Sequence, residues 1–239
     1  MDRALPLPQD SKGRRAIAQL KDPALRLKAA RKILRDGHDV TCIWLFRACR
    51  EADPAERWGD NHPLDAVRGA VRFRALRTLG RPSKLQGLDH HEAAQLLPWI
   101  IKPRDQVILF RQLQTGKDAR ILPALRALQR VVAELDPIDD DLLTAIVAMV
   151  ADPAQSTLRH AALASMLAAW PDDRAIVLLR DGAGHEAHVI RWPYIAAMLE
   201  RDPAAEGFAM AEELLDRVGP HHLLAAEVAA AIRDGRGTP

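Results

Sequence analysis

Aromatic side chains are scarce in this chain of 239 residues, where Phe, Trp and Tyr together make up 4% and tyrosine occurs once. Sheets favour aromatic and β-branched residues, whereas the Ala and Leu that dominate here favour helices. No segment alternates apolar and polar residues for long enough to predict a strand. Hydrophobic residues at 48% and charged residues at 28% are typical of a folded globular chain. The composition therefore predicts an all-α protein.

Long apolar runs are also missing. None approaches the roughly 18 residues that a membrane-spanning helix needs, and the longest, residues 142–151, includes Thr144. The N-terminus carries Asp2, Pro6 and Pro8 in place of the apolar core of a secretion signal. We therefore expect a soluble, cytoplasmic protein that has no membrane partner.

Cysteine occurs twice, at Cys42 and Cys49. Seven residues apart on one predicted helix, their Cα atoms would lie roughly 10 Å from each other, beyond the reach of a disulfide. We interpret both as core or half-buried thiols in a reducing cytoplasm.

Apolar residues at helical spacing, separated by Gly and Pro, divide the chain into about a dozen helices. They are predicted over residues 14–21, 24–35, 40–52, 63–79, 90–101, 103–115, 118–135, 139–151, 153–170, 172–180, 186–201, 204–218 and 220–233. The clearest predicted loops are residues 53–62 and 80–89. We expect a single domain over residues 14–233, with disordered segments at 1–13 and 234–239.

The segment 152–170 shows the expected unit most clearly. Asp152 is predicted to cap a helix and Pro153 to open it, because proline lacks an N–H that would need a partner there. Apolar and small residues then recur at helical spacing and are expected to face inward. One face consists of Leu158, Ala161, Ala162, Ser165, Met166 and Ala169, and a second edge of Leu163, Leu167 and Trp170. Such a helix suits the interior of a stacked array.

These patterns resemble the HEAT-repeat superfamily, in which Asp-Pro precedes Val/Leu-Arg and small residues, and other helices carry an internal proline. The matching residues are Asp152-Pro153 with Leu158-Arg159 and Ala161-Ala162, Asp22-Pro23 with Leu25-Arg26 and Ala29-Ala30, and Leu97-Pro98, Leu122-Pro123 and Trp192-Pro193. The dipeptide Asp-Pro also occurs at Asp53, Asp136 and Asp202, as a common helix start or as a reused joint. The resemblance covers most of residues 20–233. It implies an α-solenoid of about six antiparallel helix pairs in a right-handed curved stack.

Charge is distributed unevenly along the chain. Residues 1–50 carry +7, residues 51–135 carry +4 and residues 136–239 carry −9, although the total is only +2. Basic residues concentrate on the predicted helix 63–79, and we select them as the candidate binding residues. Arg74, Arg77 and Arg81 are expected on one flank, and Arg68 and Arg72 near the opposite flank. Guanidinium groups suit carboxylates and phosphates, but local pairing with acids is the alternative.

Two His-Glu dipeptides, His91-Glu92 and His185-Glu186, resemble the iron ligands of deoxyhypusine hydroxylase, a HEAT-like enzyme with four such dipeptides. With only two present, we interpret them as helix-start residues and predict no metal or cofactor. The acidic run from Asp136 to Asp141 lacks the glycine of a calcium loop and is expected to cap a helix.

The resemblance implies a non-catalytic scaffold for protein–protein interaction, with an acidic protein favoured at the basic N-terminal part. The alternative is nucleic-acid binding by that basic part, because HEAT-like alkylpurine DNA glycosylases bind DNA on a basic concave face. The five tryptophans match no motif of that family, and apolar packing is expected for all of them.

Overall fold

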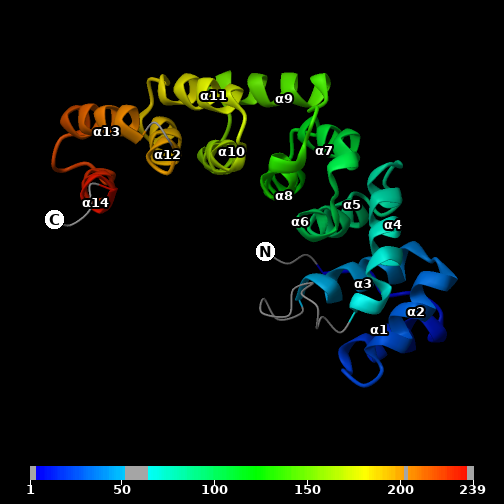
Figure 1. Cartoon of the computed structure of the whole chain (residues 1–239). Coiled ribbons are helices and arrows are strands. Elements are labelled where there is room, and N and C mark those ends of the chain that lie inside the picture. The colour runs from blue at the N-terminus through cyan, green and yellow to red at the C-terminus, as the bar shows by residue number, and fades with distance from the viewer. Residues whose placement is uncertain (1–3, 52–63, 202–203, 236–239) are drawn as a thin grey trace. The chain divides into compact units, whose positions relative to one another are not determined.

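The computed structural model describes residues 4–51, 64–201 and 204–235, and every regular element within these ranges is helical (Figure 1). The α-helices are α1 Ser11–Lys21, α2 Arg26–Asp36, α3 Asp39–Glu51, α4 Arg68–Leu79, α5 Leu88–Ala94, α6 Leu97–Ile100, α7 Gln106–Leu113, α8 Asp118–Val131, α9 Asp140–Ala151, α10 Thr157–Ala169, α11 Asp173–Ala183, α12 His188–Leu199, α13 Ala204–Val218 and α14 Ala225–Gly235. Short 3-10 helices lie at Asp65–Val67 (η2), Pro103–Asp105 (η3) and Val132–Glu134 (η4).

The all-α prediction is confirmed for these residues, and most predicted helices occur within a few residues of their expected bounds. The segment 90–101 is the exception, because it is split into α5 and α6 and Pro98 lies at the start of α6. Pro123 and Pro193 do lie inside α8 and α12, as the sequence predicts. Of the described helices, none has the length and apolarity needed to cross a bilayer; even α13 has only 15 residues.

The chain divides into two compact units, Met1–Ala127 and Leu128–Pro239. The single domain over residues 14–233 stays a prediction. The whole predicted loop 53–62 and residues 236–239 of the predicted tail lie outside the described residues.

Unit 1 begins with an extended segment that packs against α3. The side chain of Leu5 is buried, and the indole Nε1 of Trp44 donates a hydrogen bond of 2.9 Å to the carbonyl of Pro6. The α1 helix then starts at Ser11, because the Asp10 carboxylate accepts from the amide of Gly13. The disorder predicted for residues 1–13 therefore does not apply to residues 4–13. An apolar residue and a tryptophan donor hold this segment in place.

Helices α1 to α5 pack around the core of unit 1. The first three contact one another, α3 and α4 both contact α5, and α4 also contacts α2. Ile43, Leu45 and Phe46 of α3 are fully buried. The thiols of Cys42 and Cys49 lie in the same interior, and burial raises the pKa of both.

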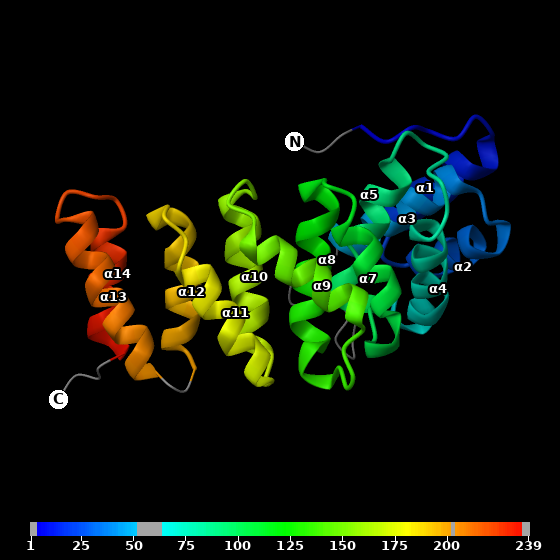
Figure 2. The ribbon, with the colours of Figure 1, turned by 90° about the horizontal axis from the view of Figure 1, so that it is seen from above.

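Unit 2 is built from consecutive helices that alternate between two layers. Helices α9, α11 and α13 form one row in Figure 1, and α10, α12 and α14 form the other. Contacts join neighbours within a layer and across it, with α12 packed against α10, α11 and α13. Seen from above in Figure 2, the pairs of unit 2 follow one another in chain order. This serial arrangement buries the sides of α10 and α12 that face neighbouring helices.

The orientation predicted for α10 is partly wrong. Its helix starts at Thr157 behind a Ser156 cap, and Leu158 is 64% exposed. Ser165 and Ala169 are exposed as well, whereas Met166 of that face and the whole of the predicted second edge are buried. Leu163 and Leu167 are fully buried there, because burying large side chains stabilises the fold more than burying small ones.

The Asp-Pro dipeptides at Asp22 and Asp152 form joints between helices rather than helix starts. Asp22 and Asp152 are the residues that end α1 and α9. In both joints the carboxylate accepts a hydrogen bond of 2.9 Å from the amide two residues later, at Ala24 and Ala154. The same side-chain turn is therefore reused in each unit, and the following helix starts four or five residues after the aspartate.

A buried polar cluster fixes the centre of unit 2. The Nδ1 atom of His160 lies 2.8 Å from the hydroxyl of Tyr194, and its ring centroid lies 5.2 Å from that of His185. The Nε2 atom of His185 lies 2.6 Å from the carbonyl of Val150. The ring of Tyr194 occupies the place of a side chain at Gly182, because a Cβ atom there would lie 2.4 Å from it. Burial raises the pKa of Tyr194, so its hydroxyl stays protonated.

This cluster predicts that unit 2 loses stability in mild acid. The pKa of His160 lies below its ordinary value of 6.5, first because burial penalises the charged ring and second because His185 repels it. Below about pH 6.5 the unfolded chain takes up a proton that the folded chain refuses, so the free energy of unfolding falls as the pH decreases. Urea midpoints at pH values of about 7.5 and 5.5 measure this loss. In a His160→Gln variant most of the pH dependence should disappear, and an unchanged dependence would point to another group.

Candidate functional site

Three of the five arginines selected from the sequence meet in one cavity of unit 1. Arg74, Arg77 and Arg81 line a pocket of about 240 Å³. The other lining residues come from the start of α3, the second half of α4 and the segment that leads into α5; they are Gly37, Asp39, Thr78, Pro82, Lys84 and Asp89. We call this cavity the basic pocket. The predicted grouping of the three arginines on one flank is confirmed.

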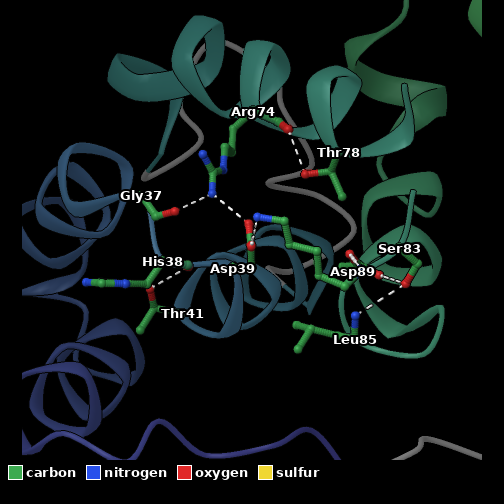
Figure 3. A network of polar contacts seen from close by, with 10 residues as sticks. Gly37, His38, Asp39, Thr41, Arg74, Thr78, Ser83, Leu85 and Asp89 are labelled. Carbon is green, nitrogen blue, oxygen red and sulfur yellow. Dashed lines mark hydrogen bonds and ion pairs between the residues drawn. The ribbon is translucent and has the colours of Figure 1, made fainter. Parts of the chain in front are cut away.

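Arg74 and Asp39 form one wall of the basic pocket (Figure 3). The Nη2 atom of Arg74 donates to Asp39 Oδ1 at 2.9 Å and also to the carbonyl of Gly37. Gly37 ends α2 with φ 71°, a left-handed conformation that glycine adopts without strain and that turns its carbonyl toward α4. Lys84 Nζ lies 3.2 Å from Asp39 Oδ2. Asp39 is therefore neutralised by two cations, and Arg74 fixes α4 against the α2–α3 turn.

Asp89 holds the loop on the other side of the basic pocket. Its buried carboxylate accepts from the Ser83 hydroxyl at 2.5 Å and from the Lys84 amide at 3.0 Å. The same hydroxyl accepts from the amide of Gly87 at 2.6 Å. Burial alone would raise the pKa of Asp89, but the hydrogen bonds from Ser83, Lys84 and His90 outweigh it and the pKa is lowered. Asp89 is thus a charged, internally satisfied group that shapes the loop.

Arg77 and Arg81 are the cations of the basic pocket that remain available. Both are exposed, and neither forms an ion pair or side-chain hydrogen bond with another described residue. Part of the charge on Arg77 offsets the negative end of the α4 dipole, because it lies in the last turn. With four cations against two aspartates, the pocket is nevertheless net positive. Chemically, it is arranged to accept one anionic group.

No model of a known protein family matches this chain, and searches of curated proteins and of solved structures also found no match. The function is therefore argued from the geometry of the chain itself.

Arg68 and Arg72 point away from the basic pocket and connect α4 to the turn after α6. Arg72 donates through Nε to the carbonyl of Ile100 at 2.9 Å, and its Nη2 pairs with Asp105 at 2.5 Å. Arg68 donates to the carbonyl of Trp99 at 3.1 Å. The predicted separation of these two arginines from the other three is confirmed. Their contacts are internal, so they support the fold and we no longer assign them to the binding site.

One side chain of each His-Glu dipeptide makes contacts inside the fold. Glu92 is fully buried and pairs with Arg47 at 2.7 Å, and His185 belongs to the cluster around Tyr194. Within the described ranges, no three His, Cys, Asp or Glu side chains gather closely enough to suggest a metal site.

Sequence reasoning missed the residues that complete the basic pocket. Asp39 lies 35 residues from Arg74 in sequence, and its pairing with Arg74 and Lys84 depends on how α3 packs against α4 and the segment that follows it. The signals that were present are the helix-ending Gly37 and the loop at residues 80–89, which together place these side chains at the end of α4.

Proposed function

We propose that the protein is a non-catalytic interaction scaffold, a HEAT-like α-solenoid that binds an acidic segment of a protein partner in the basic pocket. The observation that carries this proposal is the pair Arg77 and Arg81, two exposed cations that share a pocket and lack an acidic partner among the described residues. The serial helix layers of unit 2 support the solenoid, because stacked helix pairs are the building principle of that architecture.

The size and lining of the basic pocket favour a carboxylate side chain as the ligand. Its volume of about 240 Å³ is below the 300–1,000 Å³ typical of small-molecule sites, so it fits a single side chain better than a cofactor. Guanidinium groups bind carboxylates through paired hydrogen bonds. The titratable acids of the lining, Asp39 and Asp89, are held by ion pairs or hydrogen bonds. This lining therefore suits recognition rather than proton transfer.

The test uses a fluorescently labelled hexaglutamate peptide and the full-length chain. We expect the Arg77→Gln/Arg81→Gln variant to bind it about 5–30-fold more weakly, because two partly exposed ion pairs contribute about 0.5–1 kcal/mol each. Added salt should weaken wild-type binding, since exposed charges are screened over about 8–10 Å. Arg74 is left unchanged because its contacts with Gly37 and Asp39 support the fold.

The matched control is Arg104→Gln/Arg111→Gln, which removes the same charge from two exposed arginines outside the basic pocket. This control should bind the peptide as wild type does. Equal weakening in both variants would show that net charge and not the pocket governs binding. A hexaglutamine peptide that binds equally well would contradict the proposal directly.

A further inference from the structure

A second basic surface lies on α1 and α2, apart from the five selected arginines. A groove of about 690 Å³ is lined by five cations, Arg15, Lys28, Arg31, Lys32 and Arg35, together with Gln19, Ala24 and Leu27. Among these lining residues none is acidic. We call this surface the α2 stripe. Helices α1 and α2 contact each other, and Figure 1 shows them side by side in unit 1.

The spacing of basic residues in α2 makes the stripe continuous. Lys28, Arg31, Lys32 and Arg35 stand at positions i, i+3, i+4 and i+7, so they share one face over about 10 Å of helix. The opposite face carries Ala29, Ala30 and Ile33, which are buried.

Such a row of like charges opposes helix formation, because cations three or four residues apart repel each other. The α2 helix has five basic residues and one acidic residue, Asp36. Among the described residues Asp36 pairs with Arg35 alone, at 3.5 Å, and the Arg35 side chain remains 77% exposed. Within the described ranges the other four cations of the stripe have no acidic partner. A polyanion bound along this face would remove the repulsion.

We infer that the α2 stripe binds the phosphate backbone of double-stranded nucleic acid without reading its sequence. Protein–nucleic acid interfaces are polar and strongly positive, whereas protein–protein interfaces are depleted of lysine and depend on buried aromatic anchors. The lining of the stripe is basic and contains no aromatic residue. Single strands are usually held by bases stacked on aromatic side chains, so this lining favours a duplex.

An anionic membrane fits the stripe less well than a duplex does. An interfacial helix inserts an apolar face into the headgroup region. The apolar face of α2 is already occupied, because Ala29, Ala30 and Ile33 are buried within unit 1. The stripe could therefore attract an anionic membrane through its charge, but it has no apolar face to insert into one.

The test measures binding of the full-length chain to labelled duplexes of about 20 base pairs and unrelated sequence, made as DNA and as RNA. Contacts with about five phosphates predict that affinity falls on the order of 10²-fold between 50 and 200 mM salt. Duplexes of different sequence should bind within about threefold of each other. Comparing the affinities for the DNA and RNA duplexes shows whether the stripe distinguishes the two backbones.

The Lys28→Gln/Arg31→Gln/Arg35→Gln variant should bind duplexes at least tenfold more weakly at about 100 mM salt. Its slope of log affinity against log salt should become shallower by about 2.7, because each lost phosphate contact removes about 0.9. All three side chains are exposed, and removing like charges relieves repulsion, so the fold should be retained. Arg31→Gln alone provides a milder variant, with a slope change of about 0.9.

The matched control is Arg104→Gln/Arg111→Gln/Arg126→Gln, which removes three positive charges from exposed positions outside the stripe. It should bind duplexes within about threefold of wild type. An equal loss in the control, or an unchanged salt slope in the stripe variant, overturns the inference. So does tighter binding of a single strand, of a polyglutamate peptide of equal charge or of anionic lipid vesicles.

Discussion

Replacing Arg47 with Met is expected to destabilise unit 1 by about 3–5 kcal/mol, because it leaves a buried carboxylate without its main partner. The Glu92 side chain is completely buried, and its Oε1 atom lies 2.7 Å from Arg47 Nη2 and 3.2 Å from Nε. Arg50 Nε lies 4.0 Å from the other carboxylate oxygen of Glu92. Because this cation remains, we expect a loss of stability near the lower end of that range. Met keeps the apolar stem of the arginine, so loss of packing contributes little. Urea unfolding measures the effect.

The Arg47→Met/Glu92→Leu double variant separates the buried charge from the packing. Exchanging a buried ion pair for apolar side chains of similar volume is often neutral or stabilising. We therefore expect the double variant to recover most of the stability that the single variant loses. If Arg47→Met costs less than about 1 kcal/mol, the ion pair joining α3 and α5 contributes no more than a surface pair does.

The helices were predictable from sequence because their signals are local. Gly37 ends α2 close to the end of the helix predicted over residues 24–35, and Asp139 and Asp172 accept hydrogen bonds from the first turns of α9 and α11. The Asp-Pro joints were recognised as a recurring feature but placed on the wrong side of the turn. An aspartate beside proline is compatible with a helix start and with a helix end, and the hydrogen bonds that Ala24 and Ala154 donate to it distinguish the two.

Features that depend on packing were not predictable in the same way. Helical spacing in α10 permits two apolar faces, and the choice between them depends on which neighbours α9, α11 and α12 supply. The extended segment at Leu5 is ordered by Trp44, which lies on a different element. Neither Leu5 nor Trp44 has sequence neighbours that would predict this contact.

For the basic pocket, the sequence predicted the arginines but not the aspartates that line it. Helical spacing placed Arg74 and Arg77 on one flank of α4, and Arg81 follows two residues after the end of that helix. Whether each arginine is available for a ligand depends on Asp39, which belongs to α3 and removes Arg74 from that role. The spacing of the four α2 cations of the α2 stripe is a property of α2 alone, whereas the contribution of Arg15 depends on how α1 packs against α2.

The α10 helix offers the same substitution at two positions with opposite surroundings. Leu163 is fully buried between the layers of unit 2, whereas Leu158, five residues earlier, is 64% exposed. Leu163→Ala is expected to lower the free energy of unfolding by about 2–5 kcal/mol, because it removes buried methyl groups and leaves a cavity. Leu158→Ala is expected to change it by no more than about 0.5 kcal/mol, as is usual for exposed positions.

Thermal and urea unfolding of both variants check this pair. The change in helix propensity is the same for both, since each replaces Leu by Ala within α10, so the difference between them reports burial alone. Equal effects at the two positions would mean that the side of α10 carrying Leu163 is not buried against neighbouring helices. If Leu158→Ala lowers the free energy of unfolding strongly and Leu163→Ala does not, the inward face of α10 is the one that helical spacing alone predicts.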